Sequence, residues 1–170
     1  RLACMIHSNR TENKHNKTTE EYSSHGVSLK KTHDFRREIA KHPSLDVFGS
    51  GWSVDLPGYK GKPQPFDQKY TTLKKYKFNI VVLPAIAEDY IDEKILDSFL
   101  TLTVPVVLGP STLTDHLPSD SFININEFSD IGSLFNHLEN MTEKKYMNHL
   151  QSIQSNREDI FEDFSTKENY

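Results

Sequence analysis

Two short runs of apolar, largely β-branched residues constrain the fold of this chain more than any other feature. They occupy residues 78–83 and 103–108, and each has the length and composition of a strand that is buried on both faces of a parallel sheet. Between the two runs, apolar residues recur at helical spacing from Ile91 to Leu102. Since a strand, a helix and a second strand in this order are typical of a βαβ unit, we predict an α/β fold: an open, Rossmann-like parallel sheet with helices on both faces.

The remaining segments extend this alternation toward both ends of the chain. Further strands are predicted at 2–6, 45–48 and 121–125. Thr32, an acceptable N-cap, is predicted to start a helix that ends before Pro43, and other helices are predicted at 66–76, 128–140 and 143–162. Residues 10–28 lack apolar anchors and are predicted to form a mobile loop, and the tail after about residue 157 is acidic and polar. We therefore expect residues 1–170 to form a single domain.

Composition excludes several other classes of protein. The apolar runs are much shorter than the roughly 20 residues that are needed to cross a bilayer. The single cysteine, Cys4, rules out an internal disulfide and a multi-cysteine metal site, and we expect it to be a small core residue. The histidines have no metal-ligand spacing, and no glycine-rich phosphate motif or nucleophile elbow occurs. Because the chain begins at Arg1 without a methionine or signal peptide, we expect it to be a segment of a longer protein.

The net charge of −4 conceals an uneven distribution of charge along the chain. Residues 1–80 carry fifteen Lys and Arg against eight Asp and Glu, whereas residues 81–170 carry five against sixteen. The basic half is suited to a polyanion such as a nucleotide diphosphate, although ordinary solvated surface also accounts for such a distribution. Because the chain has neither an overall basic charge nor a base-reading motif, we do not expect nucleic acid as a partner.

Ligands of open parallel sheets bind beyond the carboxyl ends of the strands, where the following loops and helix N-termini lie. The segments that meet this condition are Ser8-Asn9, 83–94 and 109–111. In the second, Lys94 is placed on a first helical turn, where it is suited to neutralising a diphosphate oxygen, and Glu93 is suited to accepting from ribose hydroxyls. The alternative is structural, because acidic residues also favour first turns through the helix dipole.

Several segments together resemble, in order and spacing, the C-terminal, donor-binding domain of the α-1,3/1,4-fucosyltransferase family. The four main segments are Lys75–Ile80, Glu88–Ile95, Val104–Pro110 and Leu117–Phe128. Ser8-Asn9 and Leu45–Gly49 match two further positions of the family, so the resemblance covers most of residues 2–150. It implies one lobe of a GT-B architecture, in which two Rossmann-like domains enclose the active site.

The family resemblance also implies an activity. Its members transfer L-fucose from GDP-fucose, with inversion, to a hydroxyl of a glycan or glycoprotein acceptor. No metal or other cofactor is implied, because cations and helix N–H groups are able to hold the leaving GDP. The catalytic base and the acceptor site are implied to lie in an N-terminal domain outside this chain, so no catalytic residue is assigned here. For a eukaryotic source the resemblance implies the Golgi lumen and a membrane anchor outside the chain, and otherwise the cytoplasm.

The resemblance assigns donor contacts residue by residue. Tyr90 is implied to pack at the sugar-phosphate end, Glu93 to bind the ribose and Lys94 to bind the diphosphate. Ser8 and Asn9, at the end of the first predicted strand, complete the implied donor site.

The chain departs from the family pattern at three places: Leu102 stands where the family has a small glycine before its VPVV strand, and two further departures bear on the donor site. Thr32 stands where the family has a phosphate-binding arginine, so Lys31 beside it and Arg36 one turn later are expected to supply the charge. Leu83 and Pro84 replace a glutamate and an asparagine that face the donor. Two hypotheses follow: a fucosyltransferase lobe that binds GDP-fucose, or a non-catalytic relative with a degenerate donor site and a structural or protein-interaction role. A transferase for another nucleotide sugar is a third.

Overall fold

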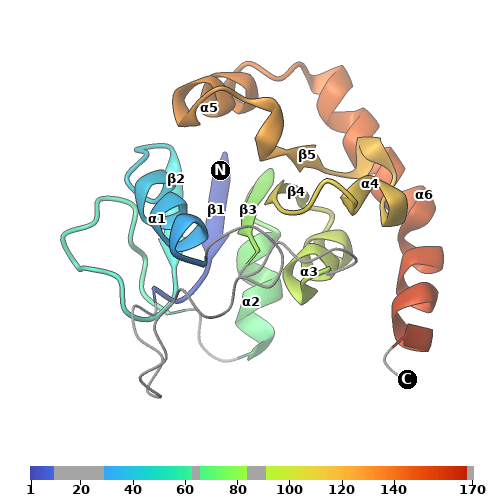
Figure 1. Cartoon of the computed structure of the whole chain (residues 1–170), viewed down its shortest axis with the longest axis horizontal. Coiled ribbons are helices and arrows are strands. Elements are labelled where there is room, and N and C mark those ends of the chain that lie inside the picture. The colour runs from blue at the N-terminus through green and yellow to red at the C-terminus, as the bar shows by residue number, and fades with distance from the viewer. Residues whose placement is uncertain (10–28, 63–65, 84–90, 168–170) are drawn as a thin grey trace.

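The computed structural model describes residues 1–9, 29–62, 66–83 and 91–167 (Figure 1). In these residues the chain forms a five-stranded sheet in the order β2-β1-β3-β4-β5, and every neighbouring pair of strands is parallel. The strands are β1 (Ala3–Ile6), β2 (Leu45–Phe48), β3 (Phe78–Val82), β4 (Val104–Leu108) and β5 (Ile123–Asn124). The predicted α/β class with an open parallel sheet is confirmed.

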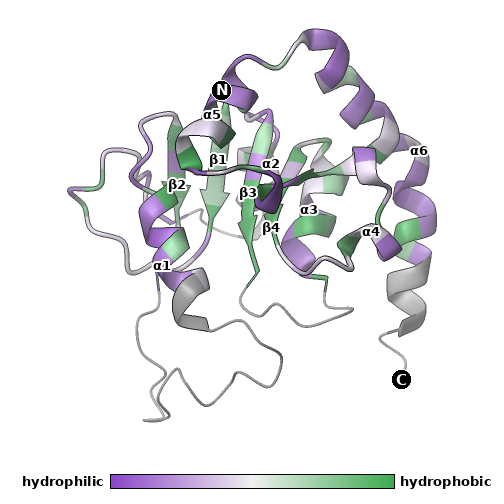
Figure 2. Cartoon of the chain, turned by 45° about the horizontal axis from the view of Figure 1, so that its top comes forward, coloured by the Kyte–Doolittle hydropathy of each residue, from purple (hydrophilic) through white to green (hydrophobic). Residues whose placement is uncertain are grey.

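Helices cover both faces of the sheet. They are α1 (Leu29–Ile39), α2 (Phe66–Leu73), α3 (Glu93–Thr101), α4 (Leu113–His116), α5 (Ile131–Glu139) and α6 (Glu143–Lys167). α1 and α5 lie on one face and α2 and α3 on the other, while α6 runs along the β5 side (Figures 1 and 2). Apolar residues gather on the strands, and the outer surface of α6 is largely hydrophilic (Figure 2). None of the helices in the described part of the chain is long and apolar enough to span a membrane.

The core is built from the predicted apolar runs. The side chains of β3 and most of those of β4 are buried, as expected for strands with helices on both faces. Cys4 is fully buried beside Leu73 of α2, which confirms it as a small core residue. Ile95 and Phe99 are fully buried and anchor α3 against the sheet. This packing holds the start of α3 rigidly beside the carboxyl ends of the strands.

The structure differs from the predicted elements at several boundaries. The expected N-cap at Thr32 is wrong, because α1 already begins at Leu29 and Thr32 is a buried residue inside that helix. α2 ends at Leu73, since the following residues form a turn in which the Tyr76 N–H donates to the Leu73 carbonyl. β5 has only two residues, because the Asn124 side chain accepts from the backbone N–H of residue 126 and begins a 3₁₀ turn. The short helix α4 was not predicted.

Candidate functional site at the β1/β3 junction

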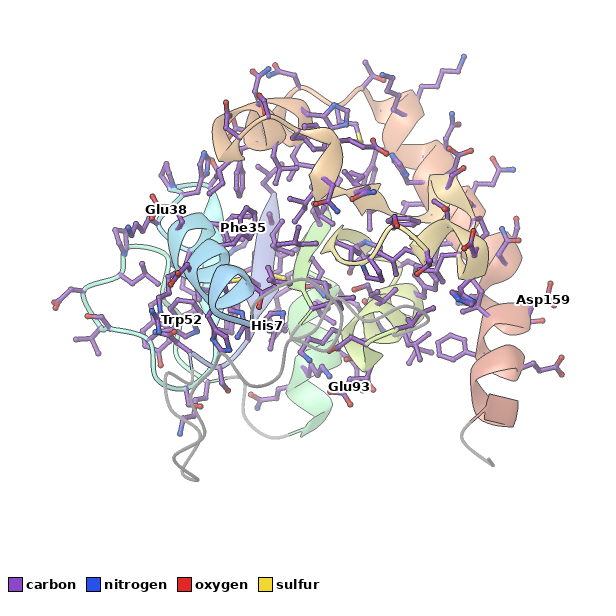
Figure 3. The ribbon with its side chains drawn as sticks, viewed as in Figure 1. His7, Phe35, Glu38, Trp52, Glu93 and Asp159 are labelled. Atoms are coloured by element: carbon purple, nitrogen blue, oxygen red, sulfur yellow. The ribbon has the colours of Figure 1, made fainter. Side chains whose placement is uncertain are left out.

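The order of the strands creates a topological switch point at the carboxyl edge of the sheet. β1 is followed in the chain by β2 on one side, whereas β3 is followed by β4 on the other side. The connections therefore diverge between β1 and β3, which is where open α/β sheets bind ligands. We call this region the β1/β3 junction and define it by residues 7–9, Arg36, Lys69, Leu83 and 92–94. His7 and Glu93 mark its two sides (Figure 3).

The end of β1 is held tightly against the loop that follows β2. The Trp52 indole N–H donates to the His7 carbonyl at 2.6 Å. Gly49 lies against the same carbonyl with a φ of +133°, and a Cβ at this position would stand 2.0 Å from the oxygen. Only glycine permits so close an approach and this backbone angle. His7 is buried, and its Nε2 accepts from the Val82 N–H at 3.4 Å, so it bridges β1 and β3.

Ser8 and Asn9 continue this connection between β1 and the β2 loop. The Ser50 hydroxyl donates to the Ser8 hydroxyl at 3.1 Å, and the Asn9 amide donates to the Gly51 carbonyl at 3.2 Å. The Ser8 carbonyl accepts from the Arg36 guanidinium at 3.1 Å. Ser8 and Asn9 therefore lie at the junction, as the sequence predicts. Their hydrogen bonds join β1 to the β2 loop, and their contact with the nucleotide-sugar donor stays a prediction.

Arg36 presents an unsatisfied donor at the junction. The residue is only 6% exposed, and within the described residues its Nε has no hydrogen-bond partner. Burial lowers its pKa from the ordinary value, and the nearby Asp92 carboxylate offsets this only in part. A buried guanidinium with a free N–H is stabilised by an additional acceptor, and oxyanions are the acceptors that suit its planar geometry.

Asp92 organises the start of α3. Its carboxylate caps the helix by accepting from the Lys94 N–H at 2.9 Å, and it also accepts from the Lys94 ammonium at 2.9 and 3.2 Å. The buried Asp92 carboxylate thus neutralises the Lys94 ammonium, the charge that was predicted to bind the diphosphate. The Glu93 side chain is 76% exposed and lies 3.6 Å from the ammonium of Lys69. The Glu93 carboxylate is therefore accessible at the edge of the junction, although it also lies within ion-pair distance of Lys69.

Basic groups from three helices converge on His7. Its pKa lies well below the ordinary value, first because the ring is buried and then because Arg36, Lys94, Lys69 and His33 place positive charge around it. These groups come from α1, α2 and α3, which are far apart in the sequence. Lys94 is paired with Asp92 and Lys69 with Asp97 and Glu93, so within the described residues Arg36 is the cation of this group without an ion-pair partner, and a diphosphate requires such a positive charge.

Some of the predicted donor residues are not placed by the structure. Tyr90, Pro84 and the predicted loop at 10–28 lie outside the described residues, and of Lys31 the structure describes only its backbone, in α1. Leu83 is fully buried, and its N–H donates to the Leu108 carbonyl at 3.0 Å. The end of β3 therefore presents an apolar residue where the family pattern has a polar one.

Three members of the junction were not singled out from the sequence. Asp92 carried a local signal, because an aspartate directly before a helical stripe is a preferred N-cap. His7 and Lys69 carried none. Lys69 reaches the site only because α2 packs beside α3, where its ammonium pairs with Asp97.

The buried His7 predicts a loss of stability in acid. In the folded chain the ring stays neutral, whereas in the unfolded chain it takes up a proton below roughly pH 6.5. The unfolded state then binds more protons, so the free energy of unfolding is highest above this pH and falls by up to about 1.4 kcal/mol per pH unit below it. Urea unfolding between neutral and mildly acidic pH measures the slope. His7→Gln should make the slope shallower, and an unchanged slope would contradict a neutral, buried His7.

Comparison with known protein families gives one match that spans most of the chain. The C-terminal model of glycosyltransferase family 10 (fucosyltransferase) matches residues 12–167. Two similar curated proteins are the α-(1,3)-fucosyltransferase 4 of Bos taurus, 33% identical over 108 residues, and the α-(1,3)-fucosyltransferase 7 of Homo sapiens, 32% identical over 113 residues. These alignments cover 62% and 65% of this chain but only 25% and 31% of the relatives, so the chain spans less than a third of their length.

Comparison with solved structures shows the same fold. A crystal structure of an α1,3-fucosyltransferase with GDP-fucose superposes with a TM-score of 0.60, covering 88% of this chain and 38% of that one. At 18% sequence identity, this likeness concerns the architecture of the lobe and not its individual contacts.

Proposed function

Because this chain belongs to glycosyltransferase family 10, the fucosyltransferases, we propose that it is the lobe that binds the nucleotide-sugar donor GDP-fucose. In this proposal the whole protein transfers L-fucose to a hydroxyl of a glycan or glycoprotein. An N-terminal domain outside this chain supplies the acceptor site and the catalytic base. The fold supports the proposal, because a solved fucosyltransferase with GDP-fucose shares it.

The observation that carries the proposal is the convergence of cations at the β1/β3 junction. Arg36 offers a buried N–H without a partner in the described residues, and Lys94 and Lys69, each paired with a buried aspartate, add two further cations at the same edge. In an open parallel sheet this junction is the place where nucleotides bind. A diphosphate that accepts from Arg36 would also compete with Asp92 for the Lys94 ammonium, and the Glu93 carboxylate would accept a hydrogen bond from a ribose hydroxyl.

In this proposal, the chemical role of the lobe is to stabilise the leaving group, GDP. In an inverting transfer, the acceptor oxygen attacks the anomeric carbon of fucose from the face opposite the phosphate. The bond between that carbon and the GDP oxygen breaks, and the acceptor proton passes to the base. Negative charge then grows on the GDP oxygen, so preorganised cations at the diphosphate lower the barrier. We propose no metal for this step, since Arg36 and Lys94 are available for the same role.

Thermal unfolding of the full chain with added nucleotides tests this proposal. At about 100 times its Kd, a bound ligand stabilises the chain by about 2.7 kcal/mol, which corresponds to roughly 5–10 °C in Tm. We expect GDP and GDP-fucose to produce such a shift, and UDP and inorganic pyrophosphate a smaller one. A panel of other nucleotide sugars tests whether a different donor is used. The absence of any shift with millimolar GDP would overturn the donor-binding proposal.

A second candidate function is a non-catalytic module that keeps the fold but not the donor site. Two observations favour it: the buried Leu83 at the end of β3 and the pairing of Lys94 with Asp92. Asp92→Asn separates the two candidates, because asparagine keeps the helix cap but releases the Lys94 ammonium. If the junction binds GDP, this variant should bind it more tightly than the wild type. If neither protein binds GDP, the non-catalytic function is supported.

A further inference from the structure

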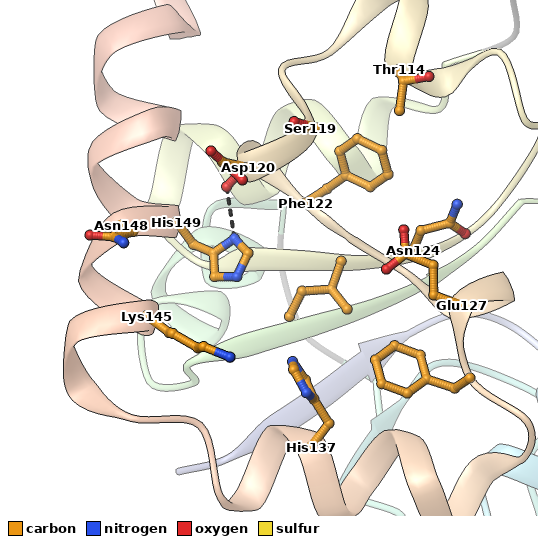
Figure 4. Close-up of a pocket in the computed structure, with 12 residues that line it drawn as sticks. Thr114, Ser119, Asp120, Phe122, Asn124, Glu127, His137, Lys145, Asn148 and His149 are labelled. Carbon is orange, nitrogen blue, oxygen red and sulfur yellow. Dashed lines mark hydrogen bonds between the residues drawn. The ribbon is translucent and has the colours of Figure 1, made fainter.

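A separate cavity lies on the β5 side of the molecule, away from the β1/β3 junction. Its volume is about 440 Å³, which is within the usual range for small-molecule sites. The cavity is lined by residues of the 3₁₀ turn Ser119–Ser121, β5, α5 and α6 (Figure 4). We call it the β5 pocket. Of the donor residues predicted from the sequence, none that the structure describes lines this pocket.

Three basic side chains gather on one wall of the β5 pocket. His137 comes from α5, and Lys145 and His149 come from the first turns of α6 (Figure 4). Burial lowers the pKa of His137, and the positive charges of Lys145 and His149 lower it further, whereas Glu127 raises it. In the part of the chain that the structure describes, the Lys145 ammonium has no acidic partner within ion-pair distance. A bound anion would give the Lys145 ammonium a direct ion-pair partner and so stabilise it.

The orientation of His149 also suits an anion. Its Nδ1 lies 2.7 Å from the Asp120 carbonyl, which can only accept, so Nδ1 carries the hydrogen. The other ring nitrogen, Nε2, therefore becomes a donor when the ring is protonated. Beside this wall, Ile123 and Phe128 provide an apolar surface, and the Phe128 ring lies 5.2 Å from the His137 ring.

We propose that the β5 pocket binds a small ligand that carries an oxyanion group: a carboxylate, a sulfate or a phosphate. Lys145, His137 and His149 hold the oxyanion, and the apolar part of the ligand packs on Ile123 and Phe128. The carboxylates of Glu127 and Asp120 also line the pocket, so a ligand with several charges is disfavoured. Binding strengthens as the pH falls and His137 takes up a proton, because the added positive charge offsets the carboxylates of Glu127 and Asp120.

Histidine ring NMR of the full chain tests the proposal. Sodium sulfate, sodium phosphate and sodium glucuronate are titrated separately at about pH 6 and about pH 8, with ionic strength held constant by sodium chloride. We expect the ring signals of His137 and His149 to shift and saturate with at least one oxyanion, more strongly at the lower pH. The apparent pKa of His137 should rise on binding. The oxyanion that binds with the lowest Kd shows whether the ligand carries a sulfate, a phosphate or a carboxylate group.

A pair of lysine variants provides the control. Lys145→Gln should weaken oxyanion binding about tenfold, the loss expected for one charge-assisted hydrogen bond. Lys144→Gln removes the same charge from an exposed neighbour that does not line the pocket, and it should leave the Kd unchanged. Equal weakening by both variants would overturn the proposal, because it would indicate screening by net charge. The proposal also fails if no oxyanion shifts the signals of His137 and His149 more than that of His42.

Discussion

Arg36→Met is expected to weaken GDP binding by about 30-fold, equivalent to about 2 kcal/mol, because it removes a buried charge-assisted donor at the diphosphate. The Arg36 guanidinium is anchored by its hydrogen bond to the Ser8 carbonyl, and its Nε has no hydrogen-bond partner in the part of the chain that the structure describes. Methionine fills a similar volume without a charge, so the packing of α1 is retained. Isothermal titration of GDP into both proteins measures the difference.

Lys41→Met is the matched control for this experiment. Lys41 lies in the turn after α1, is exposed, and pairs with Glu38 away from the junction. Its replacement lowers the net charge by the same amount and should change the GDP Kd by less than about twofold. Thermal unfolding without ligand shows whether Arg36→Met is folded. A folded Arg36→Met variant that binds GDP as tightly as the wild type would exclude Arg36 from the donor site.

Lys69→Met is expected to lower the free energy of unfolding by about 3 kcal/mol, because it leaves a buried carboxylate without its counter-charge. The Lys69 ammonium pairs with Asp97, whose side chain is only 8% exposed. Burial lowers the pKa of Lys69, but the hydrogen bond and charge of Asp97, together with Glu93, outweigh this and raise it. Urea unfolding at neutral pH measures the loss of stability.

The double variant Lys69→Met/Asp97→Leu separates the buried charge from other causes. With both charges removed, most of the lost stability should return, since an apolar pair of similar volume replaces the ion pair. Lys74→Met, in the exposed turn after α2, should change stability by no more than about 0.5 kcal/mol. A double variant as unstable as Lys69→Met would show that the lysine stabilises the fold through its packing and not by neutralising Asp97.

The strands could be predicted because their signal is local. The β-branched composition of residues 78–82 and 104–108 is itself what buries these segments between two layers of helices. Boundaries that depend on single hydrogen bonds were harder to predict. The Asn124 side chain shortens β5, and α1 begins at Leu29 before the expected cap at Thr32. Such competition between local hydrogen bonds has no periodicity that a sequence pattern can reveal.

The candidate site could be placed from the sequence but not assembled from it. Once a parallel sheet is predicted, residues that follow its strands must lie at one edge, and this locates Ser8, Asn9 and the start of α3. The contacts within the site join residues that are distant in the chain. Arg36 reaches the carbonyl of Ser8, and Lys69 and Lys94 surround His7. Which cations converge depends on the order of the strands and on how the helices pack.

By itself, then, the sequence determined the class of fold, the segments that form its core and the family to which the chain belongs, because these depend on local composition and motif order. Only the tertiary structure decided which charges meet. It paired Lys94 with Asp92, placed the Arg36 Nε at the β1/β3 junction without a hydrogen-bond partner among the described residues, and gathered the basic side chains of the β5 pocket. Electrostatic interactions act through space, so their partners are set by the packing of helices on the sheet and not by distance along the chain.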